Sequence, residues 1–182
     1  MTSFDLQASR NYDRRATRLL TGLYRHITAD VNRAAAKGAT VLDIGTGPGK
    51  LLSHMADARP DLRLHGVDLS PHMITLAADR LSGRAEPTVG DVAALPYPDA
   101  SFEVVVSSLS LHEWPDVTAA VGELHRVLAP GGLVALYDFR FVRVREARVA
   151  LAAAFGPVRR EVVRPQRHPI GLFLRLSATG RA

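Results

Sequence analysis

The stretch from Val41 to Gly49, which reads VLDIGTGPG, decides the fold of this chain. An apolar run that contains one carboxylate, Asp43, enters a glycine loop, and a helical pattern begins at Lys50. Glycine has no Cβ and adopts φ angles that other residues avoid, so its backbone can approach a ligand closely. The stretch predicts a strand, a tight turn and a helix N-terminus that cup a nucleoside-bearing molecule. Taken alone, the glycine triplet also fits a strand–helix turn that binds nothing.

The spacing of the glycines narrows the choice of ligand. Dinucleotide dehydrogenases use G-x-G-x-x-G, whereas here the glycines are Gly45, Gly47 and Gly49, and Lys50 occupies the position of the third dehydrogenase glycine. Asp43 places a negative charge beside the loop, where it would repel a pyrophosphate and attract an ammonium or sulfonium group. The loop therefore favours a cationic nucleoside over a dinucleotide.

Composition indicates one ordinary globular domain of 182 residues, with 47% hydrophobic and 23% charged residues. No apolar run approaches the ~20 residues of a membrane-spanning helix, and the N-terminus lacks a hydrophobic signal core, so we expect a cytoplasmic protein with no membrane partner. The absence of cysteine excludes disulfides, thiolate metal sites, iron–sulfur clusters and a cysteine nucleophile.

Positive charge gathers in the last part of the chain. Up to Phe139 there are 13 Lys and Arg against 16 Asp and Glu, and from Arg140 onward there are 10 Arg against two Glu. A basic segment can bind nucleic acid or an anionic substrate. However, no aromatic residues interleave with these arginines as a base-stacking surface requires. Nucleic acid is therefore a disfavoured partner.

A second carboxylate, Asp68, follows the short strand expected over residues 62–67 and lies 19 residues beyond Gly49. Nucleotide-binding folds place at this distance the acid that accepts hydrogen bonds from the ribose hydroxyls. The alternative is an Asp that caps the next helix, but Ser70 and Pro71 already supply an N-cap and a first-turn proline. In that helix Met73 belongs to the apolar face, which predicts either a core residue or one that lies against an adenine.

Two further segments carry a family pattern. Asp91 to Phe102, DVAALPYPDASF, matches "D…LP-x-P-D-x-S-F", and Arg126 to Gly132, RVLAPGG, matches "R-V-L-x-P-G-G". With the glycine loop, these segments make the chain resemble class I S-adenosylmethionine (SAM)-dependent methyltransferases, of the group that includes ubiquinone/menaquinone-biosynthesis and other small-molecule enzymes. The resemblance covers roughly Val41 to Phe139.

That resemblance implies an α/β fold: a doubly wound, largely parallel seven-stranded sheet, Rossmann-like, with one antiparallel strand and an N-terminal helical lid. It implies one domain over 1–182, with lid helices at 1–38, a SAM-binding core at 39–139, and a C-terminal helix and closing strands at 140–182. It also implies SAM as cofactor, with S-adenosylhomocysteine (SAH) as product. The implied cofactor-binding residues are Asp43, Gly45, Thr46, Gly47, Asp68, Leu69, Met73, Asp91, Val92 and Ser107.

The segment after the central strand, Ser107 to Trp114, is where the acceptor is expected to meet the cofactor. His112 is the candidate general base, because an imidazole changes its charge near working pH. The alternative is a histidine that packs or hydrogen-bonds in the substrate loop, and Glu113 is a weaker candidate. No second Asp is placed to pair with Asp138 as a magnesium site, so we expect no metal. Tyr12 and Asp13, expected just before the first helix, are candidates for contact with SAM or substrate.

The expected activity is methyl transfer from SAM to a small-molecule acceptor by in-line displacement. Two alternatives remain open: methylation of RNA or protein through the Arg-rich C-terminal part, and a regulatory protein that binds SAM without transferring its methyl group. A homodimer is also left open, since a second subunit is one of the ways in which the acceptor pocket could be covered.

Overall fold

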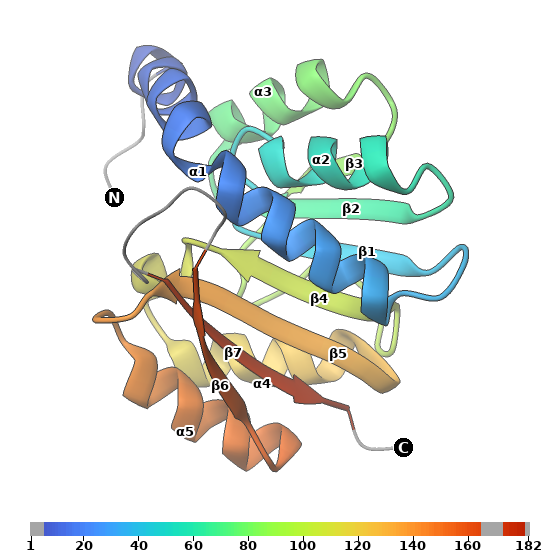
Figure 1. Ribbon diagram of the computed structural model, residues 1–182, viewed down its shortest axis with the longest axis vertical. Coiled ribbons are helices and arrows are strands. Elements are labelled where there is room, and N and C mark those ends of the chain that lie inside the picture. Colours follow the sequence, from blue (N-terminus) through green and yellow to red (C-terminus); the bar gives the residue numbers. More distant parts are fainter. Residues whose placement is uncertain (1–5, 165–172, 181–182) are drawn as a thin grey trace.

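The fold was analysed in a computed structural model that describes residues 6–164 and 173–180, with side chains from residue 20 onward. The described residues form a seven-stranded sheet in the order β3-β2-β1-β4-β5-β7-β6 (Figure 1). Strand β7 runs antiparallel to both of its neighbours, and the other pairings are parallel. The strands are β1 (Thr40–Ile44), β2 (Arg63–Asp68), β3 (Glu86–Val89), β4 (Phe102–Ser108), β5 (Leu128–Phe139), β6 (Arg159–Val163) and β7 (Phe173–Thr179).

Helices cover both faces of this sheet. One face carries α1, α2 and α3, and the other carries α4 and α5 (Figure 1). The buried side chains form two apolar clusters, one for each face, as expected of a parallel sheet made of continuous apolar strands. The fold is therefore the predicted doubly wound one. The helices are α1 (Leu6–Ala34), α2 (Lys50–Ala58), α3 (Pro71–Leu81), η1 (Leu111–Glu113), α4 (Val117–Val127) and α5 (Val144–Phe155).

A buried polar cluster fastens α1 to the sheet. The Tyr137 hydroxyl on β5 donates to Asp30 Oδ2 on α1 at 2.6 Å, and the Arg175 guanidinium on β7 lies 3.3 Å from the same oxygen. Arg33 pairs with the other Asp30 oxygen. Burial, followed by the contact with Asp30, raises the pKa of Tyr137 well above its usual value, so the phenol stays a donor. Leu23, Tyr24, Ile27 and Val31 of α1 are buried around this cluster.

Several predicted boundaries were wrong. The sequence of Thr88 to Val92 predicts a third strand followed by an acid, whereas β3 runs from Glu86 to Val89. The helical spacing after Pro115 predicts that Leu128 belongs to the preceding helix, whereas Leu128 begins β5. Tyr12 and Asp13 lie within α1, which begins at Leu6, and not before it; their side chains lie outside those described. The sequence also predicts a closing antiparallel pair at 158–163 and 170–176, and β6 and β7 form such a pair. Residues 170–172 of the prediction lie outside the described residues. The lid role of residues 1–38 stays a prediction.

Candidate active site

The glycine loop joins β1 to α2 at the carboxyl edge of the parallel strands. Gly45, Gly47 and Gly49 have φ values of 66°, 52° and 72°, in the left-handed region that favours glycine. A Cβ at Gly45 would clash with the Ser110 side chain, whereas a Cβ at Gly47 would project into open space. The loop thus packs tightly against the segment after β4 on one side. On the other side, at Gly47, it leaves room for a ligand to approach the backbone.

Asp43 lies in β1 immediately before this loop and is fully buried. Its Oδ2 accepts a hydrogen bond from the Thr46 hydroxyl at 2.9 Å, and no partner is found for Oδ1 among the described residues. Burial, which outweighs the Thr46 hydrogen bond, raises the pKa of Asp43 to about 7, and the nearby Asp68 adds to the shift. A buried carboxyl oxygen without a partner costs free energy, so this site fits a cationic ligand that approaches it. Thr46, predicted to bind the cofactor, uses its hydroxyl to hydrogen-bond Asp43 in this structure.

Asp68 ends β2 and ties together the two segments that flank the ligand site. Its Oδ2 accepts the Gly47 N–H at 2.8 Å and its Oδ1 accepts the Ser70 N–H at 2.9 Å. Burial raises the pKa of Asp68, and these two N–H groups oppose that shift. Each carboxylate oxygen has a further lone pair, so hydroxyl groups of a ribose can still donate to it. The predicted cap of the next helix is confirmed, because Ser70 accepts from the Met73 N–H.

The remaining residues expected around the cofactor take different positions at this edge. Leu69 is 59% exposed, which is unusual for a large apolar side chain, while Met73 is buried. Asp91 is exposed and accepts the Ala93 N–H at 2.9 Å, and Val92 is half-buried. Since the Gly90 N–H donates to the Asp68 carbonyl at 3.0 Å, the segment of Asp91 lies beside that of Asp68. The contacts of these residues with SAM stay predictions.

Ser107 is more deeply placed than expected for a residue that touches a ligand. It is buried, and its hydroxyl lies 2.7 Å from the Ser110 hydroxyl. The Ser110 hydroxyl also donates to the Ile44 carbonyl at 3.2 Å and accepts from Trp114 Nε1 at 3.2 Å. These bonds join the end of β1, the end of β4 and the two residues that flank η1 into one polar cluster. The Ser107 side chain therefore holds Ser110 in place and is not exposed at the surface of the site.

His112 lies in η1 and contacts Asp138, and the sequence did not predict this contact. The ring Nδ1 of His112 is 3.1 Å from both oxygens of Asp138, the next-to-last residue of β5, and the His112 N–H donates to Asp138 Oδ2 at 3.1 Å. Asp138 is buried and also accepts the Phe139 N–H at 2.7 Å. An ionised carboxylate can only accept, so Nδ1 carries the hydrogen and Nε2 of a neutral ring keeps its lone pair.

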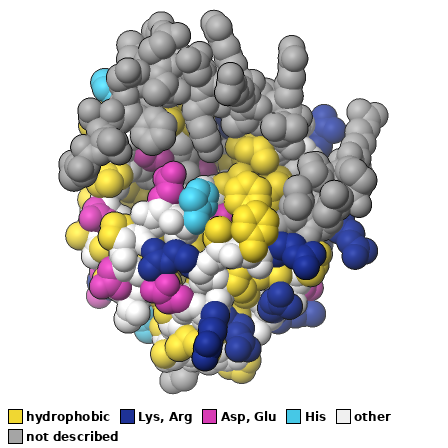
Figure 2. Space-filling view, turned by 90° about the vertical axis from the view of Figure 1, so that its left-hand side faces the viewer, with side chains coloured by type: hydrophobic (Ala, Val, Ile, Leu, Met, Phe, Trp, Pro, Cys, Tyr) yellow, Lys and Arg dark blue, Asp and Glu magenta, His cyan; other side chains and the backbone are white. Residues whose placement is uncertain are grey.

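The side chain of His112 is 34% exposed, so Nε2 can meet a molecule from outside. The weaker candidate, Glu113, is more exposed, and its carboxylate lies 3.9 Å from His112 Nε2. Figure 2 views the molecule from the left-hand side of Figure 1 and shows a histidine near the centre, hydrophobic side chains beside it, and arginines or lysines to the left of, to the right of and below them. Among the described residues, no three His, Asp or Glu side chains gather as metal ligands would.

A glycine loop flanked by two acids, at the carboxyl edge of a doubly wound sheet, defines a nucleoside-binding α/β protein. The chain belongs to the methyltransferase domain family, whose profile matches residues 42–136. SAM-dependent methyltransferase is accordingly its class. The unpaired Asp43 oxygen and the open approach at Gly47 fit the cationic groups of SAM.

Individual relatives agree with this class. The chain is 38% identical over 104 residues to a demethylmenaquinone methyltransferase of Deinococcus radiodurans, covering 54% of this chain and 42% of the relative. It is 40% identical over 110 residues to the 27-O-demethylrifamycin SV methyltransferase of Amycolatopsis mediterranei, covering 58% of this chain and 40% of the relative. The chain thus spans about half the length of the curated relatives it matches.

Solved structures show the same fold over nearly the whole chain. A Haloferax volcanii protein in complex with the methyltransferase activator Trm112 superposes with a TM-score of 0.84 at 21% identity, covering 100% of this chain and 99% of that one. A TehB-like SAM-dependent methyltransferase of Corynebacterium glutamicum gives a TM-score of 0.76 at 20% identity, covering 98% and 100%. No helix in the described part of the chain is long and apolar enough to cross a membrane.

Proposed function

We propose that this chain transfers a methyl group from SAM to a small-molecule acceptor whose nucleophile carries a proton. The observation that carries the proposal is the His112–Asp138 pair, which lies at the carboxyl edge of β4 and β5 beside the glycine loop. SAM supplies an electrophilic methyl group on its sulfonium. The chain must hold the acceptor in line with that group, and positioning of this kind can lower a barrier by ~7–11 kcal/mol.

The cofactor is held, in this proposal, by residues from three neighbouring strands. Asp43 faces a cationic group, Gly45 to Gly47 receive the ligand against their backbone, and Asp68 accepts from the ribose hydroxyls. Asp91 and the Val92 N–H meet the adenine edge, because an adenine offers one donor and one acceptor side by side. Leu69 and Met73 lie against the adenine ring, which would cover the exposed Leu69 side chain.

His112 acts as the general base. Asp138 fixes the ring so that Nδ1–H points at the carboxylate and Nε2 points toward the acceptor, and it stabilises the charge that the ring gains when Nε2 takes the proton. Both Asp138 oxygens contact Nδ1, and one also holds the backbone of His112, so the ring has little freedom to turn away. A protonated nucleophile such as a hydroxyl or an enolisable carbon would need this base.

The proposal is tested by a screen of small-molecule acceptors with SAM labelled in its methyl group. The expected result is labelled product with at least one hydroxylated or enolisable acceptor, together with a rise in melting temperature when SAH is added. A ligand present at ~100 times its Kd stabilises the folded state by ~2.7 kcal/mol. Stabilisation by NADH and not by SAH would contradict the proposal at its first step.

The curated relatives named above act on demethylmenaquinone and on a rifamycin, which supports a small organic acceptor. The same screen would distinguish two alternatives from this proposal. One is methyl transfer to RNA or protein through the Arg-rich C-terminal part, and the other is SAM binding without transfer. Label found in added RNA or protein alone would favour the first. Stabilisation by SAH with no labelled product in any fraction would favour the second.

A further inference from the structure

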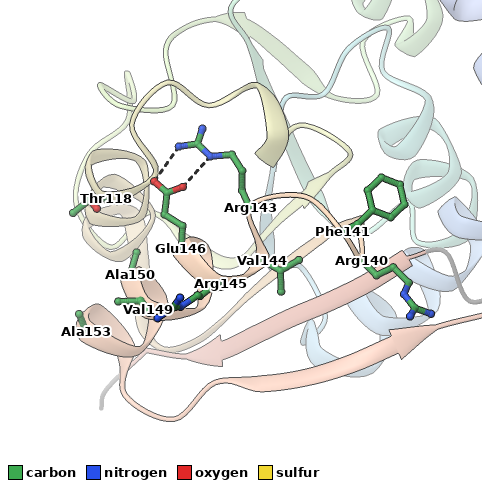
Figure 3. A pocket seen from close by; sticks show the side chains of 10 residues that line it. All are labelled: Thr118, Arg140, Phe141, Arg143, Val144, Arg145, Glu146, Val149, Ala150 and Ala153. Carbon is green, nitrogen blue, oxygen red and sulfur yellow. Dashed lines mark hydrogen bonds and ion pairs between the residues drawn. The ribbon is translucent and has the colours of Figure 1, made fainter.

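A furrow of about 670 Å³ runs along the outer face of α5 and the loop that joins β5 to this helix (Figure 3). Its lining combines apolar side chains, among them Phe141 and Val149, with three arginines, Arg140, Arg143 and Arg145. Small-molecule sites commonly enclose ~300–1,000 Å³, with mostly apolar walls and a few polar groups that fix orientation. The furrow has both the size and the mixture of side chains of such a site.

The apolar part of the furrow is exposed to a degree unusual for its residue types. Phe141 is 74% exposed and Val149 is 60% exposed. Burying apolar surface contributes ~25 cal/mol for each Å², so a ligand that covers a phenylalanine ring and a valine gains affinity from both. Both side chains line the furrow, Phe141 from the loop and Val149 from α5, and exposed apolar surface bordered by charge is typical of a binding site.

The charges along the furrow are not balanced. Arg143 forms two hydrogen bonds of 2.9 Å with the Glu146 carboxylate and also donates to the Trp114 carbonyl, so its charge is satisfied within the fold. Arg145 is exposed, and no carboxylate pairs with it among the described residues. Arg145 is therefore a positive charge along the furrow that no acidic side chain among the described residues offsets, and such a charge favours an anion.

A chain of rings joins the furrow to the proposed base. Phe141 stacks on Phe139 with ring centroids 5.6 Å apart and an angle of 16° between the planes, and the Phe139 ring lies 6.3 Å from the ring of His112. The link from Arg143 to the Trp114 carbonyl holds the loop against the segment that follows η1. A molecule lying in the furrow can therefore extend past Phe141 toward His112 Nε2.

From these observations we infer that the furrow is the acceptor site, and that the methyl acceptor is a small molecule with an apolar body and an anionic group. The apolar body lies on Phe141 and Val149, the anion lies near Arg145, and the nucleophilic end points toward His112. This inference rests on the proposed function, because it names the class of acceptor for that same site. It also gives a use to Arg145, one of the ten arginines that follow Phe139.

The test is a calorimetric titration of the full chain, in the presence of SAH, with three eight-carbon probes: octanoate, octanol and octyltrimethylammonium. Octanoate is expected to bind saturably and at least tenfold more tightly than the other two. Arg145→Glu and Phe141→Ala should each weaken octanoate about tenfold, which corresponds to ~1.4 kcal/mol. Arg148→Glu is the matched control, because Arg148 is an exposed arginine of α5 that does not line the furrow, and it should change the affinity less than twofold.

Equal binding of the three probes, or an equal loss of affinity in Arg145→Glu and Arg148→Glu, would overturn the inference. The titration of SAH into the same preparations separates this result from failure of the proposed function. If SAH binds and an acceptor is methylated while octanoate fails to bind selectively, the furrow assignment alone falls. If SAH does not bind at all, the proposed function falls, whatever octanoate does.

Discussion

Asp138 holds His112 at three points: both of its carboxylate oxygens lie 3.1 Å from the ring Nδ1, and one of them accepts the His112 backbone N–H. The two residues are 26 positions apart in the chain and meet because β4 and β5 are adjacent, with Ser108 opposite Tyr137. A carboxylate in this place sets both the tautomer and the direction of the ring.

The first prediction follows from this pair. His112→Gln is expected to lower turnover ~10²–10⁴-fold, the usual contribution of a positioned general base, because glutamine cannot take the proton. Steady-state kinetics of the variant and the wild type provide the measurement. Unchanged turnover would show that His112 is part of the pocket wall.

Asp138→Asn provides a separate test of the positioning role. The amide can donate to Nδ1 and so favours the tautomer whose Nε2 carries the hydrogen, which cannot accept the proton. Turnover should fall while SAH affinity stays within twofold, since Asp138 contacts His112 and Phe139 and not the glycine loop. A loss of SAH affinity as large as the loss of turnover would mean that the carboxylate supports the cofactor site instead.

The second prediction concerns Asp68 and Asp91, the two acids proposed to contact the cofactor. Asp68→Ala should weaken SAH binding by ~1.5–3 kcal/mol, since ribose hydroxyls lose a charged acceptor and the Gly47 N–H loses its partner. Asp91→Ala should cost less, because the backbone N–H of Val92 survives the change. Isothermal titration of SAH gives both values. Wild-type affinity in Asp68→Ala would reduce this residue to a cap of the segment before α3.

The third prediction uses the raised pKa of Asp43. The folded protein without ligand holds a proton on Asp43 up to a pKa of about 7, whereas the unfolded chain loses it near the ordinary value of 3.8. Between these values the folded state binds more protons, so this group makes the protein less stable as pH rises, by up to ~1.4 kcal/mol for each pH unit. Above about pH 7 the penalty is complete, and below 3.8 it is absent.

Asp43→Asn removes this titration and tests it directly. Without ligand, the variant should gain stability relative to wild type as pH rises from 5 to 7, and the gain should level off at higher pH. Urea unfolding at several pH values measures the difference. The same variant should bind SAM more weakly, because the amide cannot offer a negative charge to a cationic group. A constant difference in stability across this range would contradict the assigned pKa.

The sequence indicated most of the fold because the deciding features are local. The run Val104 to Val106 marks a strand buried on both faces, and the glycine loop is defined by nine consecutive residues. The third strand was harder to delimit. Glu86 is charged and Pro87 has no backbone N–H to donate, so neither residue indicates a strand, although both are tolerated on an edge strand such as β3. Leu128 keeps the helical spacing of Leu124, yet its backbone is extended and begins β5.

The candidate site was predicted only in part, for a related reason. The residues near the cofactor follow single strands, so their order in the chain already places them at one edge of the sheet. The pairing of His112 with Asp138 depends on the register of two strands, which no local pattern encodes. A usable indication existed: Asp138 lies near the end of the apolar strand that follows β4, and acids near the carboxyl ends of parallel strands meet at the same edge of the sheet. The burial of Ser107 beneath Ser110 depends in the same way on a contact between β1 and β4.

The fourth prediction concerns the attachment of α1. Tyr137→Phe removes the 2.6 Å hydrogen bond to Asp30, and a bond to a charged group contributes ~1.5–3 kcal/mol. Urea unfolding should show a loss of this size with no change in the slope against denaturant. In a double-mutant cycle with Asp30→Asn, the two changes should couple by ~0.5–3 kcal/mol. Additive effects would show that the two side chains do not depend on each other.

The fifth prediction is that methyl transfer, once an acceptor is found, continues in the presence of EDTA. In the described part of the structure no acidic cluster suited to a hard cation is present, and the Asp138 oxygens already contact His112 and the Phe139 N–H. Rates with and without the chelator should agree within experimental error. A loss of activity that magnesium restores would require a cation at the carboxyl edge of β5.

The cluster around Ser110 has a consequence for the order of events in a catalytic cycle. Ser110 contacts the Ser107 hydroxyl, the Ile44 carbonyl and the Trp114 indole, and Gly45 leaves no room between the loop and this side chain. The glycine loop, where the cofactor is proposed to bind, and the segment that carries the proposed base His112 are thus packed together as one rigid unit. Binding of the cofactor is therefore expected to fix the position of the residues that the acceptor then contacts. Initial-rate patterns should therefore be those of an ordered sequence, with the cofactor entering first and its demethylated form leaving last.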